Sequence, residues 1–124
     1  MSFLSKATRQ QIEERVNSRA SCESVPSYDL EKLPDEKIVV VTTQNGNIYL
    51  VEKDWPKAEP SKSVYFHLYR LYSHGAPSGY RGLKQMIPML QVGRPLVYVI
   101  NNAPNDFKNP SSFKTTKISA IYLD

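Results

Sequence analysis

The sequence predicts an α+β protein, with a curled, mostly antiparallel five-stranded sheet or a partly open small barrel as its body. An N-terminal helix and one short helix before the fourth strand complete the predicted fold. The first observation is that two β-branched and aromatic runs flank the turn-forming pair Asn45-Gly46. The second is that similar apolar runs recur, and that stretches rich in proline, glycine and asparagine separate them. The predicted strands after this hairpin cover residues 63–72, 95–100 and 113–123.

Residues 37–53 predict a hairpin with Asn45 and Gly46 as a two-residue turn. Such a turn places Val41 opposite Leu50 and Val40 opposite Val51. Side chains alternate between the two faces of a strand, so this pairing assigns every residue to a face. One face carries Val39, Val41, Ile48 and Leu50, and the other carries Ile38, Val40, Thr42, Tyr49 and Val51. Both faces are apolar, and we therefore expect the hairpin to be covered on both sides.

All residues, 1–124, are expected to form a single domain with a helix at about 3–19, a linker at about 20–36 and a β-rich body at 37–124. Apolar residues of the helix follow a narrow stripe, with Thr8 and Gln11, or Ser2, as start signals. The expected role of this helix is to cover one side of the hairpin; the alternative is a helix that docks on another chain or is an exposed arm. Pro26 and Pro34 disfavour regular structure in the linker, which Tyr28, Leu30 and Leu33 would hold against the domain.

Residues 63–72 fit both a helical and a strand period, and their aromatic and β-branched content favours the strand. As a strand, Phe66 and Leu68 share one face, whereas Tyr65, His67, Tyr69 and Leu71 share the other. Residues 73–82 predict a loop. The following segment, 83–93, predicts a short helix limited by Pro88, with Leu83, Met86, Ile87 and Leu90 as core residues. Regular alternation in the last strand places Ile118 and Ile121 on opposite faces.

The composition is that of an ordinary globular protein, with 40% hydrophobic and 23% charged residues. Cys22 is the single cysteine, and the sequence has neither a secretory leader nor an apolar run long enough to cross a bilayer. We therefore expect a cytoplasmic protein that does not associate with a membrane.

The sequence contains no motif for catalysis or for a cofactor. The two histidines, His67 and His74, have no zinc-ligand spacing, and no metal site is expected. Cys22 has no CxxC partner, and no GxSxG, Walker or GxGxxG motif is present. We expect no cofactor and no enzymatic activity, although a small enzyme whose active site assembles only in space remains an alternative.

Positive charge is concentrated in the C-terminal half of the chain. Residues 64–124 hold seven Lys or Arg against two Asp, together with six of the eight tyrosines. We interpret this half as the surface of a non-catalytic binding module, in which a protein–protein interaction or an accessory or inhibitory role is expected and the partner is a protein or a second copy. The alternative is binding of single-stranded nucleic acid, because cations neutralise phosphates and tyrosines stack on bases. The predicted binding residues are Tyr65, His67, Tyr69, Arg70, Tyr80, Arg81, Lys84, Lys114 and Lys117.

Overall fold

The computed structural model describes residues 3–18, 23–34, 37–53, 65–71, 78–100 and 111–123. Cys22, Trp55 and His74 lie outside these residues. The N-terminal elements are α1 (Phe3–Lys6), α2 (Arg9–Ser18), β1 (Ser24–Val25), β2 (Ser27–Asp29) and the 3₁₀ helix η2 (Leu30–Lys32). The remaining elements are strands, namely β3 (Ile38–Thr43), β4 (Ile48–Lys53), β5 (Tyr65–Leu71), β6 (Gly79–Met86), β7 (Met89–Gln91), β8 (Pro95–Ile100) and β9 (Ser111–Leu123).

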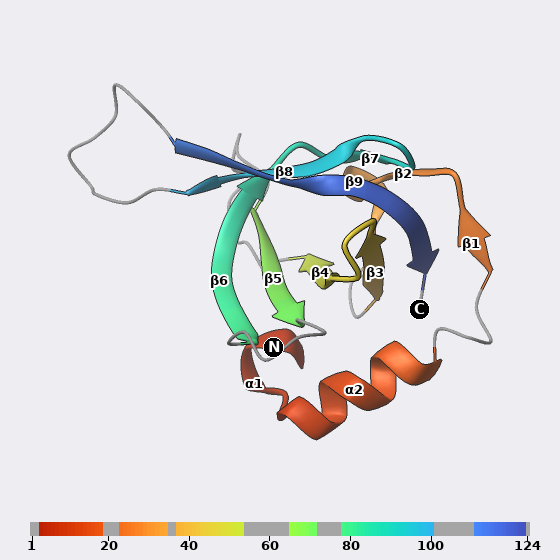
Figure 1. Cartoon of the computed structure of the whole chain (residues 1–124). Helices are drawn as coiled ribbons and strands as arrows, with labels where there is room; N and C mark the ends of the chain where they lie inside the picture. Colours follow the sequence, from red (N-terminus) through yellow and green to blue (C-terminus); the bar gives the residue numbers. More distant parts are fainter. Residues whose placement is uncertain are drawn as a thin grey trace.

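Six antiparallel strands form a closed barrel (Figure 1). The strand order is β9-β3-β4-β5-β6-β8, and β8 closes the barrel by pairing with β9. Strand β1 pairs with β9 outside the barrel, and β2 pairs with β7 in a separate ribbon. The predicted small, mostly antiparallel barrel is confirmed, but the barrel is closed and not partly open, and the predicted count of five strands is wrong. Closure depends on β9, which at 13 residues is long enough to pair with β8 along its first half and β3 along its second.

Two apolar clusters lie on the two sides of the sheet. The first fills the barrel and includes residues from η2 and from seven strands. The second lies between the outer face of β3, β4 and β5 and the two N-terminal helices (Figure 1). The prediction that both faces of the hairpin are covered is therefore confirmed. The members of the second cluster are Leu4, Ile12, Val16, Ile38, Val40, Leu50, Tyr69 and Leu71.

The hairpin register differs from the prediction by one residue. Thr43 and Asn47 bracket a three-residue loop, in which the Gly46 N–H donates to the Thr43 carbonyl at 2.9 Å and the Thr43 N–H donates to the Asn47 carbonyl at 3.0 Å. Gly46 has φ 84°, which fits a type I turn followed by a left-handed residue. Val40 is consequently opposite Leu50, and Val41 is opposite Tyr49.

The slip exchanges the predicted faces of the second strand. Tyr49 and Val51 join Val39 and Val41 inside the barrel, whereas Leu50 joins Val40 under the helices. The prediction was wrong because a tight two-residue turn and this three-residue loop both accept Asn-Gly, and the side-chain period of two turns a slip of one residue into a change of face.

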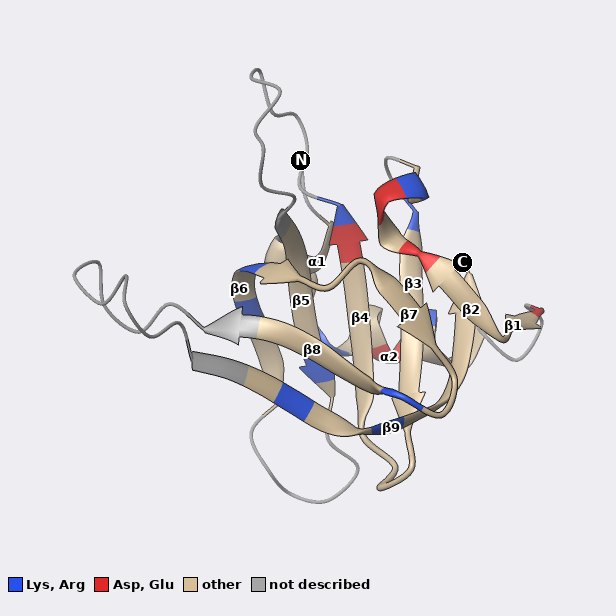
Figure 2. Ribbon diagram, turned by 90° about the horizontal axis from the view of Figure 1, so that it is seen from above, with Lys and Arg blue, Asp and Glu red and all other residues tan. Residues whose placement is uncertain are grey.

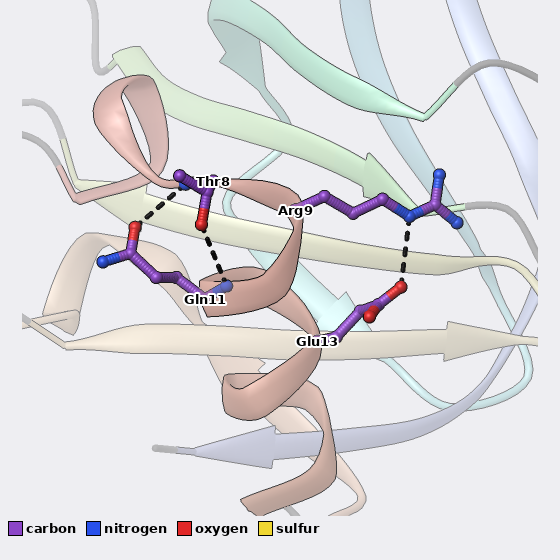
Figure 3. A network of polar contacts seen from close by, with 4 residues as sticks. All are labelled: Thr8, Arg9, Gln11 and Glu13. Atoms are coloured by element: carbon purple, nitrogen blue, oxygen red, sulfur yellow. Dashed lines mark hydrogen bonds and ion pairs between the residues drawn. The ribbon is translucent and has the colours of Figure 1, made fainter.

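The predicted N-terminal helix is two helices, with a break at Ala7 and Thr8. The Thr8 hydroxyl accepts the Gln11 N–H at 3.3 Å, and the Gln11 side-chain oxygen accepts the Thr8 N–H at 2.9 Å (Figure 3). This reciprocal pair is a capping box, and it starts α2. Leu4, Ile12 and Val16 are buried on the chain's own sheet, which confirms the covering role.

The predicted linker contains short regular elements. Leu30 and Leu33 are buried in the barrel cluster, and Tyr28 packs against it, so these three residues hold the segment in place as expected. Strand β2 adds backbone pairs with β7, and the Val92 N–H donates to the Pro26 carbonyl at 3.0 Å.

The strand expected at residues 63–72 is confirmed as β5, but the helix expected at 83–93 does not form. Strand β6 extends through residues predicted as loop and helix, and β7 follows Pro88. Pairing of β6 with β5 over residues 79–85 overrides the local helical pattern. The Pro88 carbonyl accepts the Leu30 N–H at 2.8 Å. Met86 and Leu90 are buried as expected, whereas Leu83 and Ile87 are exposed.

A bulge in β9 breaks the alternation predicted for the last strand. Thr42 is opposite Ala120 and Thr43 is opposite Ile118, so Ser119 is an extra residue. The extra residue rotates the strand, and Ile118 and Ile121 both lie in the barrel cluster. Their predicted placement on opposite faces was wrong.

Candidate interaction surface

Tyr69 is not on the surface. Strand β5 alternates as expected, with Phe66 and Leu68 inside the barrel and Tyr69 and Leu71 on the outer face beneath the helices. Tyr69 is 5% exposed, so its ring offers no face to a nucleic-acid base. The side chain of Tyr65 lies outside the described part of the chain. The structure therefore removes Tyr69 from the predicted set of stacking residues.

His67 is also buried, and it holds Tyr80. The Nδ1 atom of His67 lies 2.6 Å from the Tyr80 hydroxyl, and the two ring centroids are 5.8 Å apart. His67 is directly opposite Glu52 on β4, another buried polar residue. Tyr80 itself is exposed. His67 is thus buried, whereas its predicted binding role calls for an exposed side chain, and it contacts an exposed tyrosine.

A bulge in β6 brings Tyr80 and Leu83 to the same outer face. Tyr80 is opposite Tyr69 and Gly82 is opposite Leu68, so Arg81 is the extra residue. The sequence gives only a weak signal for this bulge. The signal is Gly82, whose φ of 95° is a backbone angle that glycine adopts readily. The three predicted cations of these two strands, Arg70, Arg81 and Lys84, are half-buried.

The other two predicted cations, Lys114 and Lys117, are exposed on β9. Lys114 is opposite Val97, and Lys117 is opposite Pro95. Arg94 is also exposed. It lies beside Lys117, because its carbonyl accepts the Ile118 N–H at 2.8 Å. The set of predicted binding residues did not include Arg94. Its position directly after Gly93, in the turn before a strand, was the available signal.

The described residues of β5 to β9 and the turns between them carry six cations and no acidic side chain. These cations are Arg70, Arg81, Lys84, Arg94, Lys114 and Lys117. The acidic residues that the structure describes lie instead in α2, in the segment from residue 23 through η2, and on β4 (Figure 2). The fold therefore converts an uneven charge along the chain into an uneven charge in space.

Exposed apolar side chains occur in the same part of the chain. The exposed large hydrophobic residues of the described chain are Tyr80, Leu83, Ile87, Met89 and Val92, all of them between β6 and the turn after β7. Sequence reasoning placed Leu83 and Ile87 in the core because it assigned a helix to this segment. A strand that turns at Pro88 exposes them.

A pocket of about 200 Å³ lies at the other end of β9, lined by Tyr28, Leu33, Pro34, Lys37, Ile38 and Leu123. Burial raises the pKa of the Tyr28 hydroxyl above its ordinary value of 10.0, and the neighbouring Asp29 carboxylate raises it further. The lining includes Leu123 of β9 but no residue of β5 to β8.

Within the described ranges, no group of three or more His, Cys, Asp or Glu side chains is placed to hold a metal ion. The described helices also include none with the length and apolar character needed to cross a membrane.

Comparison of the chain with protein-family models, with curated proteins and with solved structures found no match.

Proposed function

We propose that this protein is a non-catalytic binding module that recognises another protein through the acid-free side of its barrel, by which we mean the described residues of β5 to β9 and of the turns between them. The observation that carries the proposal is the coincidence of six cations with exposed aliphatic side chains on β5 to β9. Protein interfaces combine apolar contacts with arginine and tyrosine, and Arg81, Arg94 and Tyr80 belong to this side.

Binding of single-stranded nucleic acid is the less favoured alternative. Such binding relies on aromatic platforms between cations, and the burial of Tyr69 removes one of the two tyrosines expected on β5. The exposed residues Leu83, Ile87 and Met89 are aliphatic and do not stack on bases. Aliphatic side chains of this kind instead gain free energy when a partner protein removes them from water.

The proposal gives the N-terminal helices no part in binding. The N-terminal helices bury Leu4, Ile12 and Val16 on their own sheet, so the alternative in which the helix docks on another chain loses its main support. The helices instead cover the outer face of β3, β4 and β5, and none of the six cations belongs to that covered cluster.

The test is site-specific photo-cross-linking in the cell that makes this protein. A photoreactive residue replaces Leu83 or Met89 on the acid-free side, or the exposed Glu14 of α2 as the matched control. We expect adducts of one defined protein from positions 83 and 89 and none of that protein from position 14. Equal adducts from all three positions would overturn the proposal.

A second measurement separates protein from nucleic acid. Fluorescence-anisotropy titrations with short single-stranded DNA and RNA, at low and at near-physiological salt, are expected to show weak binding at most. Tight binding that falls steeply as salt is added would favour nucleic acid over a protein partner.

A further inference from the structure

The segment around Pro88 and the adjoining strands β8 and β9 form one surface, which we name the β7–β9 face. Its residues are Ile87, Met89, Val92, Arg94, Lys114 and Lys117. We infer that the occupant of this face is an acidic segment of the partner protein in which apolar side chains alternate with carboxylates. The inference rests on the proposed function and specifies the partner's chemistry.

The apolar part of the face is rigidly displayed. Ile87 and Met89 are both 55% exposed, whereas Met86 and Leu90 in the same stretch are buried in the barrel cluster. Buried neighbours fix the backbone, and the β2–β7 ladder fixes it from the other side. Binding of a partner to these side chains therefore costs little conformational entropy in the segment that carries them.

The cationic part lies beside the apolar part. The Ile87 N–H donates to the Val97 carbonyl at 3.2 Å, and Val97 is opposite Lys114 on β9. Adjacent strands lie about 4.8 Å apart, so the backbone of Lys114 is about 10 Å from that of Ile87. Arg94 follows Val92 by two residues in the turn and adjoins Lys117. Figure 1 shows β7, β8 and β9 gathered on the side of the barrel away from the two helices.

Acidic residues limit the face on its other border. Met89 is opposite Asp29 on β2, and Glu31 follows in η2 (Figure 2). A polyanion such as nucleic acid, or a membrane surface rich in anionic lipid, would meet these carboxylates as it spread over the face. A narrow acidic segment that runs along β8 avoids them. Its carboxylates reach Lys114 and Lys117, and its apolar side chains cover Ile87 and Met89.

The experiment measures binding of a short fluorescein-labelled peptide in which glutamate and leucine alternate. Two comparison peptides replace either leucine with serine or glutamate with lysine. We expect saturable binding of the glutamate–leucine peptide alone, moderately weakened by salt. Equal binding of the glutamate–serine peptide would overturn the apolar part of the inference, and equal binding of the lysine–leucine peptide would overturn the acidic part.

Charge variants locate the site. Lys114→Glu with Lys117→Glu is expected to weaken binding about tenfold or more, because each substitution replaces attraction by repulsion. Lys6→Glu with Arg9→Glu changes the net charge equally at exposed positions of the two N-terminal helices and is expected to leave binding within about twofold. The neutral pair Lys114→Gln with Lys117→Gln repeats the test if charge reversal impairs folding. Equal loss from both pairs of sites would show a general charge effect and overturn the inference.

Two further titrations distinguish an acidic protein segment from a lipid surface and from nucleic acid. Vesicles containing phosphatidylserine and a single-stranded oligonucleotide are titrated under the same conditions. If either binds more tightly than the glutamate–leucine peptide and depends on Lys114 and Lys117, the inference is overturned. Protein adducts from position 83 without adducts from position 89 would overturn the β7–β9 face while leaving the proposed function intact. Loss of adducts at both positions would overturn both.

Discussion

The Tyr80 hydroxyl lies 2.6 Å from Nδ1 of His67, so an exposed tyrosine on β6 is held by a buried histidine on β5. The contact joins neighbouring strands next to the bulge at Arg81. The hydrogen bond restrains the Tyr80 side chain on the outer face. The hydrogen bond thus lets a buried residue of the barrel fix the position of an exposed residue on the acid-free side.

Substitution Tyr80→Phe is expected to lower the free energy of unfolding by about 1–3 kcal/mol, because the ring remains while the hydroxyl partner of a buried imidazole is lost. Urea denaturation measures the change. Leu83→Ala, on the same strand and exposed, is the control and is expected to cost less than Tyr80→Phe. Equal stability of Tyr80→Phe and the natural chain would mean that the hydrogen bond contributes nothing to folding.

Glu52 is expected to hold the N-terminal helices in place. Its two carboxylate oxygens accept the backbone N–H groups of Phe3 and Leu4 at 3.1 and 3.2 Å. Glu52→Gln replaces one acceptor oxygen by an amide donor, which cannot accept either N–H, and we expect a loss of about 1–3 kcal/mol. Hydrogen exchange at residues 3–6 should accelerate. Glu14→Gln on exposed α2 is the control, and unchanged exchange in Glu52→Gln would contradict the prediction.

The conformation of the three-residue hairpin loop predicts that replacing Gly46 by a residue with a side chain destabilises the protein. Gly46→Ala places a Cβ on a backbone at φ 84°, which is expected to destabilise the protein by about 1–2 kcal/mol. Gln44→Ala, in the same loop and exposed, is the matched control. Thermal denaturation compares the two variants. Equal midpoints would argue against the left-handed conformation at Gly46.

Tyr28 is expected to make stability depend on alkaline pH. Its pKa in the folded protein is raised above the ordinary 10.0, so the folded state holds the phenolic proton more tightly than the unfolded chain does. The resulting contribution to stability is fully present below pH 10 and is lost as pH rises from about 10 through the folded pKa. Tyr28→Phe should therefore lose less stability than the natural chain between pH 9 and 11. Parallel losses would contradict the prediction.

Local sequence signals correctly predicted those elements for which the tertiary structure offered no competing arrangement. The pair Thr8 and Gln11 started α2, and the apolar run at residues 63–72 formed β5. At residues 83–93 the local pattern favoured a helix, but pairing of β6 with β5 prevailed. The local helical preference of a short amphipathic run is weaker than the stabilisation from long-range backbone pairing.

The candidate site was only partly predictable for the same reason. Lys114 and Lys117 are exposed as their strand pattern suggested, but Tyr69 and His67 lie beneath or beside elements distant in the sequence. Exposure of Ile87 and Met89 depends on β7, which the sequence analysis did not predict. The backbone hydrogen bond from Ile118 to Arg94 places Arg94 beside the lysines of β9.

By itself, the sequence determined the β-rich class, the existence of the hairpin, the covering helix and the positive charge of the C-terminal half, because composition and periodicity are local properties. The tertiary structure decided the hairpin register, the closure by β9, the bulges at Arg81 and Ser119 and the burial of Tyr69. Each of these depends on which distant backbone groups pair, and a shift of one residue in such pairing reverses the face of every side chain that follows.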